Sequence, residues 1–462
     1  AGWSTTANTH QCFGIAAYNL ALDCMADDLI MQSQGNGWFW GDHCYNVKSN
    51  YTSSAFRSYD VWYANYKWIA NVNYIIDAEP EMAGTEADVA YVAGQAYAIR
   101  ALCYLNLATW FSRAPYNSLT GASRWNEPCV PVYTTGTSID TGGQPRESLR
   151  TVYGRIDQDI DRAIELLEKA RETTLAENNK SHINLYVALG IKSRACLAEG
   201  DWDGAFKAAK RVIDEGGYAV GTKSDLTGGM NSLDKQNVMW GAGIQVADQA
   251  GGYAGFFTHM DNKEGAYAKS APKLISKQLY NRISATDIRR DWWDPSDKES
   301  PYVSKKFSFA NVASFLGDYI YMRVEEMYFT AAEAALRLDD LKSARELMNT
   351  VMAERDPGYS ANNRSGTLLG ATTTTWTGSF LENILTHRRI ELWGEYGRLF
   401  DVRRLGQGID RRTDDGFSEE CISMMNRRNV NITKADTYDW VLTIPKAELD
   451  ANPNINEEDQ NP

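Results

Sequence analysis

Features that would point to several common functional classes are missing from this sequence of 462 residues. It contains no apolar run of about 18 residues or more, which a transmembrane helix requires. Lysine and arginine are not clustered, and 47 basic against 60 acidic residues give a formal charge of −13. This balance argues against a nucleic-acid partner, which needs a basic surface, and against a polybasic contact with anionic lipid.

Metal-binding patterns are scarce as well. Only five histidines are present, and the seven cysteines are scattered without a Cys-x-x-Cys pair, so the sequence shows no zinc framework. A cluster of acidic residues could bind calcium through oxygen but lacks the spacing of a calcium-binding loop; it comprises Asp287, Asp291, Asp294 and Asp297. We therefore predict neither a metal nor a cofactor.

Aromatic residues, in contrast, are abundant, with 14 tryptophans and 25 tyrosines. Packing in the core explains most of them. The alternative for some is a platform for sugars, because an aromatic face packs against the C–H face of a pyranose while nearby polar groups bind its hydroxyls.

Apolar periodicity predicts a mainly helical fold with three helical pairs. The helices are expected at 87–111 and 148–170, at 184–199 and 202–215, and at 323–338 and 340–355. In the second and third pairs the small residues Ser193 and Ala332, and then Ala205 and Ala344, recur at the tetratricopeptide spacing. Generic helical hairpins would also place alanine at their crossings. The segments 31–51 and 216–322 have little helical period and are expected to form loops and short strands, and a further short strand is expected at 439–444.

The segment 387–406 is expected to form one buried helix, because it is apolar on more than one side. Its charged residues are spaced by three, four and three, so they would stack along one helix face; they are Arg388, Glu391, Glu395 and Arg398. Buried charges must be paired. We interpret this row as an internal ion-pair network rather than as an active site.

Six collinear segments are distinctive when taken together. They are WYANYKWIANVNYII (62–76), QAYAIRALCYLNLATWFSRAP (95–115), ALGIKSRACLAEGDWDGAFKAAKRVIDEGGYAV (188–220), YMRVEEMYFTAAEAALRLDDLKSARELMNTVMAERD (321–356), the segment 387–406 and LTIPKAELDANPNINEEDQNP (442–462). In this order they resemble the SusD/RagB family, the surface glycan-binding lipoproteins of Bacteroidetes. The resemblance spans about 60 to 462, and the first 60 residues fit less tightly.

This resemblance implies a right-handed α–α superhelix of tetratricopeptide-like hairpins with long loops and a few short β-hairpins. It implies a single domain over 1–462: a helical scaffold at 60–215 and 321–406, a loop-rich ligand face at 31–51 and 216–320, and a closing segment at 407–462.

The resemblance also implies a function and a location. The protein would be a non-catalytic, lipid-anchored protein on the outer face of the outer membrane. It would capture an oligo- or polysaccharide and pass it to a SusC-like TonB-dependent transporter. Because the chain starts at Ala1, without an initiator methionine, the lipid-anchor cysteine would lie upstream.

Aromatic residues in the irregular segments are the candidate sugar contacts. Trp38, Phe39 and Trp40 are adjacent and flanked by glycines, so at least one ring is expected to be exposed, with Asn36 and Asp42 as partners for hydroxyls. Trp292 and Trp293 lie among charged residues, which favours exposure of one ring. Further candidates are Tyr253, Phe257 and Tyr302. Core packing is the alternative for each candidate. The tryptophans on helices or hairpin turns are assigned to the core: Trp62, Trp68, Trp110 and Trp202.

Two other functions stay open from the sequence. A tetratricopeptide scaffold would bind only protein, through the concave faces of its helices. A glycoside hydrolase would need two carboxylates at a set separation across the scissile bond, and no such pair stands out among the 60 acidic residues.

Overall fold

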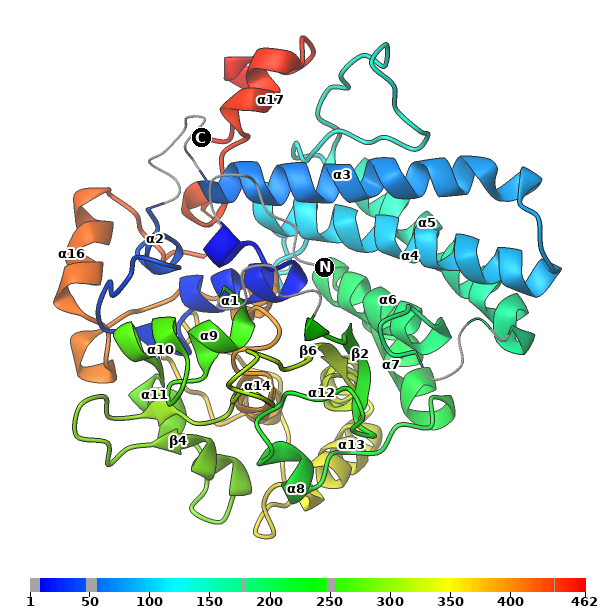
Figure 1. The fold of residues 1–462 in the computed structure, drawn as a ribbon. Coiled ribbons are helices and arrows are strands. Elements are labelled where there is room, and N and C mark those ends of the chain that lie inside the picture. Colours follow the sequence, from blue (N-terminus) through cyan, green and yellow to red (C-terminus); the bar gives the residue numbers. More distant parts are fainter. Residues whose placement is uncertain (1–8, 47–55, 174, 176–178, 247–253, 436) are drawn as a thin grey trace.

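The structure, a computed structural model, describes residues 9–46, 56–173, 175, 179–246, 254–435 and 437–462 (Figure 1). The three predicted helical pairs are present within a few residues of their expected bounds. They are α4 (Glu86–Phe111) with α5 (Leu149–Lys169), α6 (Leu185–Glu199) with α7 (Trp202–Glu215), and α12 (Val324–Arg337) with α13 (Leu341–Ala353). The helix α3 (Phe56–Ala78) packs along α4.

Local sequence signals set the ends of these helices. Five of them begin after a residue whose side chain accepts a hydrogen bond from a backbone N–H of the first turn: Thr85, Ser148, Asn184, Asp201 and Asp340. The helix α6 ends at Gly200, whose φ of 76° suits glycine. In the third pair, Asp339 holds the left-handed conformation with φ of 61° and lies where the repeat prefers glycine.

The small residues at the predicted helix crossings are fully buried. Ser193, Ala205, Ala332 and Ala344 each have 0% exposed surface. The helix α12 packs against both α7 and α13, and α5 packs against both α4 and α6. Successive hairpins therefore stack into one helical layer, with α3 along its edge (Figure 1).

The remaining helices are short and surround this layer. They are α1 (Ile15–Met25), α2 (Trp40–His43), α8 (Lys223–Leu226), α9 (Phe256–Met260), α10 (Ala266–Ser270), α11 (Lys277–Tyr280), α14 (Phe380–Glu391), α15 (Arg398–Leu405), α16 (Glu419–Arg427) and α17 (Lys446–Ala451). Single turns of 3-10 helix occur at Thr9–Gln11, Glu79–Glu81, Ala170–Glu172, Ile288–Trp292, Thr413–Asp415, Tyr438–Trp440 and Glu457–Asp459.

Two small antiparallel sheets hold the irregular segments. One has the strand order β1 (Leu29–Met31), β3 (Lys273–Ile275), β5 (Val303–Ser304) and β4 (Trp293–Asp294); the other pairs β2 (Val238–Ala242) with β6 (Tyr319–Arg323). Leu29 lies opposite Ile275, so the first sheet ties the N-terminal segment to the loops between α7 and α12.

The strand expected at 439–444 is not formed, and that prediction is wrong. The N–H of Leu442 donates to the carbonyl of Trp110, and the N–H of Ile444 donates to Oε1 of Gln460 at 2.7 Å. The backbone groups of this segment are thus satisfied by a helix end and a side chain, without a partner strand.

The segment 387–406 forms two helices rather than one. The helix α14 ends at Glu391 and α15 begins at Arg398, because Gly394 and Gly397 take positive φ angles of 76° and 89°. The four charged residues of this segment therefore do not share a helix face, and the prediction that they pair among themselves is wrong.

Their role as buried ion-pair partners is nevertheless confirmed. Glu391 has 0% exposed surface, and its carboxylate accepts hydrogen bonds from Arg289, Arg323 and Arg355 at 2.9–3.1 Å. Burial acts to raise the pKa of Glu391, but the three guanidinium groups outweigh it and hold the pKa well below its usual value. Glu395 pairs with Arg323 at 2.7 Å.

We call the eight residues joined in this way the Glu391 cluster. Its cations are Arg289, Arg323, Arg355 and Lys306, and its anions are Asp287, Glu325, Glu391 and Glu395. The four positive charges balance the four negative charges. The two other charged residues of 387–406 pair elsewhere, Arg388 with Asp401 at 2.8 Å and Arg398 with Asp28 at 3.1 Å.

Candidate functional site

Most of the aromatic residues predicted around position 38 are buried. Phe39 and Trp40 have 0% and 3% exposed surface, so neither is the exposed ring expected among the three. Asp42 is buried as well, because both oxygens of its carboxylate accept hydrogen bonds from Arg57 at 2.9 Å. Trp38 is half-buried, with its ring stacked on His10 at 4.5 Å between centroids, and Asn36 is exposed.

The second predicted group, Trp292, Trp293 and Phe257, is also buried, with 3%, 1% and 2% exposed surface. The indole N–H of Trp292 donates to the carbonyl of Leu226 at 2.9 Å, and the ring lies 4.5 Å from Nζ of Lys306. Of the charged residues next to these rings in sequence, Arg289 is a buried member of the Glu391 cluster, whereas Asp291 is exposed. Both rings are thus buried although a charged neighbour reaches the surface, and the prediction of exposure is wrong.

The remaining predicted residues are not brought together. Tyr302 is half-buried and packs edge-on against Tyr280, with ring centroids 5.1 Å apart. Tyr253 lies outside the described residues. Within the described ranges, no group of three or more His, Cys, Asp or Glu side chains could hold a metal ion. Asp287, one of the four clustered acidic residues, is paired with Arg289 at 2.7 Å.

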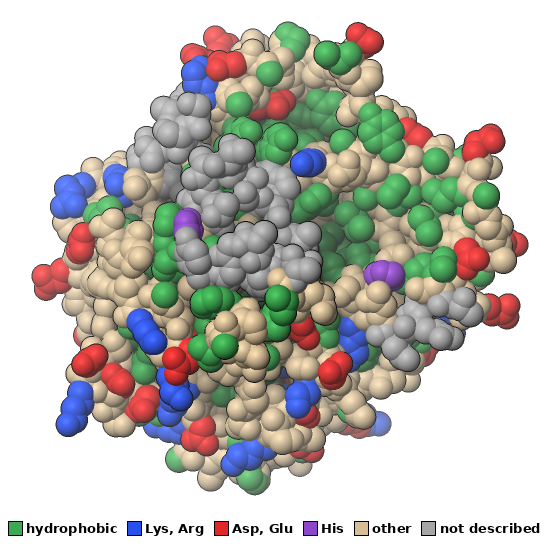
Figure 2. Space-filling view, in the orientation of Figure 1, with side chains coloured by type: hydrophobic (Ala, Val, Ile, Leu, Met, Phe, Trp, Pro, Cys, Tyr) green, Lys and Arg blue, Asp and Glu red, His purple; other side chains and the backbone are tan. Residues whose placement is uncertain are grey.

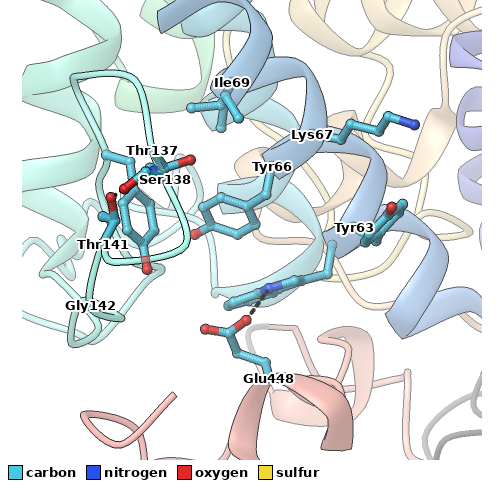
Figure 3. A pocket seen from close by; sticks show the side chains of 12 residues that line it. Tyr63, Tyr66, Lys67, Ile69, Thr137, Ser138, Thr141, Gly142 and Glu448 are labelled. Atoms are coloured by element: carbon cyan, nitrogen blue, oxygen red, sulfur yellow. Dashed lines mark hydrogen bonds between the residues drawn. The ribbon is translucent and has the colours of Figure 1, made fainter. Parts of the chain in front are cut away.

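A cavity of about 460 Å³ lies at a different place, between α3, the loop 133–142 and α17 (Figure 3). We call it the α3 groove. It is lined by Trp62, Tyr63, Tyr66, Lys67, Ile69 and Ala70 of α3, by Tyr133, Thr137, Ser138, Thr141 and Gly142 of the loop, and by Glu448 of α17. In the space-filling view, hydrophobic side chains gather on the face formed by α3 and the loop beside it (Figure 2).

Aromatic rings form one wall of the α3 groove. The ring centroids of Trp62 and Tyr66 are 4.9 Å apart, and Tyr133 meets Tyr66 edge-on at 5.8 Å. Tyr63 is 44% exposed and stacks on Tyr59, with centroids 5.6 Å apart and an angle of 14° between the rings. Because Tyr59, Tyr63 and Tyr66 follow helical spacing, their rings line one side of α3.

A carboxylate lies at the edge of this aromatic wall. Oε2 of Glu448 accepts a hydrogen bond from the indole N–H of Trp62 at 3.1 Å, and Oε1 accepts one from Nδ2 of Asn452 at 2.8 Å. The carboxylate and the indole therefore hold each other in place (Figure 3). Hydroxyl side chains on the loop complete the opposite wall: Thr137, Ser138 and Thr141.

The loop wall is fixed to α3 by hydrogen bonds. Nδ2 of Asn73 donates to the carbonyls of Tyr133 and Thr135 at 3.2 and 2.9 Å. The N–H of Gly136 donates to Asp77 at 2.6 Å, and the hydroxyl of Tyr74 donates to the carbonyl of Thr137. Just after the loop, the carbonyl of Gln144 accepts a hydrogen bond from Nδ2 of Asn452 at 2.9 Å. The groove is thus built before any ligand binds.

Comparisons with known proteins identify the family. Residues 264–462 match the SusD family, and residues 14–197 match a SusD-like family described as starch-binding and associating with the outer membrane. The chain belongs to the SusD family. No curated protein is significantly similar to it in sequence.

Solved SusD-like structures share the whole fold. A SusD-like carbohydrate-binding protein from Bacteroides vulgatus ATCC 8482 is 25% identical, with 98% of this chain and 94% of that chain covered and a TM-score of 0.77. A SusD superfamily protein from Bacteroides thetaiotaomicron VPI-5482 is 23% identical over 96% and 94%, with a TM-score of 0.76. Surface glycan-binding protein A from Bacteroides uniformis is 18% identical over 96% and 93%, with a TM-score of 0.67. The predicted SusD-like α superhelix is confirmed.

No helix within the described residues is both long enough and apolar enough to cross a bilayer.

Sequence reasoning missed the α3 groove. Trp62, which the sequence places in the core, is only 5% exposed, yet it lines the cavity. The available signal is the spacing of Tyr59, Tyr63 and Tyr66 on one helix. Glu448 and the loop hydroxyls could not be found in this way, because they lie far from α3 in sequence.

Proposed function

We propose that this SusD-family protein binds carbohydrate without catalysis, and that the α3 groove is its glycan site. The observation that carries the proposal is that the exposed ring of Tyr63 and the fixed carboxylate of Glu448 line one preformed cavity. Exposed aromatic faces next to fixed hydrogen-bonding groups are what a pyranose needs for binding. The solved structures of similar fold include a carbohydrate-binding protein and a surface glycan-binding protein, which supports the same conclusion.

The groove argues against hydrolysis. A glycosidase places two carboxyl groups across the scissile bond. Among the described residues that line the α3 groove, Glu448 alone carries a carboxylate. Both of its oxygens already accept hydrogen bonds from protein groups.

The finer parts of the proposal follow from the family. The protein would be lipid-anchored at the outer surface of the outer membrane and would pass its glycan to a SusC-like TonB-dependent transporter. The family description that mentions the outer membrane supports this location. Asn36, Trp38 and Tyr302 keep some exposed surface, and contacts from them to a glycan remain predictions.

The experiment is native gel electrophoresis of the purified protein in gels that contain single polysaccharides, with a reducing-sugar assay on the same mixtures. Retardation without release of reducing sugar is expected for at least one polysaccharide. Release of sugar would support the hydrolase. Unchanged mobility in every gel would contradict carbohydrate binding and favour a scaffold that binds only protein.

A further inference from the structure

The charges around the α3 groove define which class of glycan it can take. Its lining carries one cation, Lys67, and one anion, Glu448, so the formal charges cancel. Two more carboxylates lie beside it: Asp77, exposed near the end of α3, and Asp140, exposed between the lining residues Ser138 and Thr141. Because the whole chain has a formal charge of −13, an anionic polymer approaching this face meets net repulsion.

The two charged side chains that line the groove differ in how firmly the protein holds them. Nζ of Lys67 lies 5.9 Å from the ring centroid of Tyr63, on an exposed side chain. Glu448 is half-buried and fixed by Trp62 and Asn452. The fixed charge at the aromatic wall is thus the negative one, and the positive one is held only loosely.

An ionised carboxylate offers about four acceptor positions, and protein donors occupy two of those of Glu448. The other two suit hydroxyl groups, which donate hydrogen bonds. The carboxylate of a uronic acid can only accept hydrogen bonds, and so can a sulfate ester. Either group would be repelled by the carboxylate of Glu448 instead of binding it. Such an apposition of like charges is unfavourable in a partly desolvated site.

We infer that the α3 groove selects uncharged polysaccharides, with a neutral pyranose stacked on the Tyr63 side of the aromatic wall and its hydroxyls donating to Glu448. This inference rests on the proposed function, and it adds the class of ligand. Binding should change little with salt, because no charged pair forms between protein and glycan.

The test compares two sets of polymers on the same protein by affinity electrophoresis at low and at physiological ionic strength. The neutral set contains amylopectin, laminarin, galactomannan and arabinoxylan. The acidic set contains polygalacturonate, alginate and chondroitin sulfate. We expect retardation by at least one neutral polymer, equal at both ionic strengths, and none by the acidic set. An acidic polymer that retards the protein more than every neutral one would overturn the inference and leave the proposed function standing. No retardation by either set would overturn both.

A single variant distinguishes the effect of Glu448 in the groove from the effect of the overall surface charge. Glu448→Gln is expected to weaken binding of the neutral polymer by about three- to ten-fold, since the amide offers a donor where the carboxylate accepts. The same variant should narrow the preference for neutral over acidic polymers. The matched control is Asp450→Asn, the same chemical change on the same helix at an exposed residue paired with Lys446. It should leave the affinity for the neutral polymer and the preference for neutral over acidic polymers unchanged. Equal effects of the two variants would contradict a role for Glu448.

Discussion

Removing the charge of Glu391 should destabilise the fold strongly. In Glu391→Gln, the Glu391 cluster keeps four cations and only three anions, and four hydrogen bonds from guanidinium groups lose their charged acceptor. Breaking a buried ion pair on one side costs about 3–5 kcal/mol, because the remaining charge is left unpaired. A typical free energy of unfolding is about 5–15 kcal/mol, so about a fifth or more of it would be lost.

The assay is urea unfolding followed by tryptophan fluorescence, and Trp292 is a suitable reporter because its ring lies over Lys306 of the cluster. The control is Glu165→Gln, the same chemical change at a residue paired with Arg162 and Lys169. The side chain of Glu165 is 52% exposed, so a loss within about 0.5 kcal/mol is expected.

A double variant tests whether the unpaired buried charge causes the loss of stability. Glu391→Gln combined with Arg355→Gln restores the balance of charge, so its loss should be at least about 1 kcal/mol smaller than the sum of the two single losses. An unfolding free energy of Glu391→Gln within about 1 kcal/mol of the wild type would refute the reasoning. The folded fraction of Glu391→Gln should bind glycan as the wild type does, because Glu391 does not line the α3 groove.

Three further predictions concern a buried acid, the loop wall and the core. Burial raises the pKa of Asp23 to about 8, above its unfolded value of about 3.9. The folded state therefore holds an extra proton between about pH 4 and pH 8, and stability falls as pH rises through this range. Asp23→Asn should reduce this dependence of the unfolding free energy on pH by up to about 1.4 kcal/mol per pH unit. Urea unfolding at about pH 5 and about pH 7.5 measures it. The same dependence on pH in the variant and the wild type would contradict the role of Asp23. Gly136→Ala would place a Cβ 2.7 Å from the Tyr74 ring and should weaken glycan binding in calorimetry, whereas Gly154→Ala on α5, which meets no atom within 4 Å, should not. Trp293→Ala should lower the free energy of unfolding in urea by about 3–5 kcal/mol and leave the affinity for glycan unchanged. A variant of normal stability that no longer binds glycan would instead show that Trp293 contacts the ligand.

The helical scaffold could be predicted from sequence because its signals are local. Apolar periodicity, capping residues such as Ser148 and Asn184, and small residues such as Ala205 and Ala344 all act within one hairpin. The segment 387–406 shows where periodicity fails. Its apolar and charged residues fit one helix, but Gly394 and Gly397 introduce a turn that only their positive φ angles allow.

Exposure of aromatic side chains could not be predicted in the same way. Charged neighbours in sequence favour a surface position for Trp292 and Trp293. Yet Arg289 is a buried partner of Glu391, 102 positions away. Lys306, which lies over the ring of Trp292, donates to the carbonyl of Glu391. Conversely, the α3 groove joins α3 to Glu448, 386 residues from Trp62. A site assembled over such separations depends on tertiary packing, which no local pattern encodes.

The location of the glycan site is tested most directly by isothermal titration calorimetry of Tyr63→Ala against a polysaccharide that binds the wild type. Loss of one exposed stacking ring is worth about 0.5–1.5 kcal/mol, so the affinity should fall by about two- to ten-fold. The control is Leu338→Ala at the end of α12. Leu338 is 43% exposed and Tyr63 is 44% exposed, and the control variant should bind as the wild type does. Equal affinities of Tyr63→Ala and the wild type would contradict the α3 groove as the glycan site.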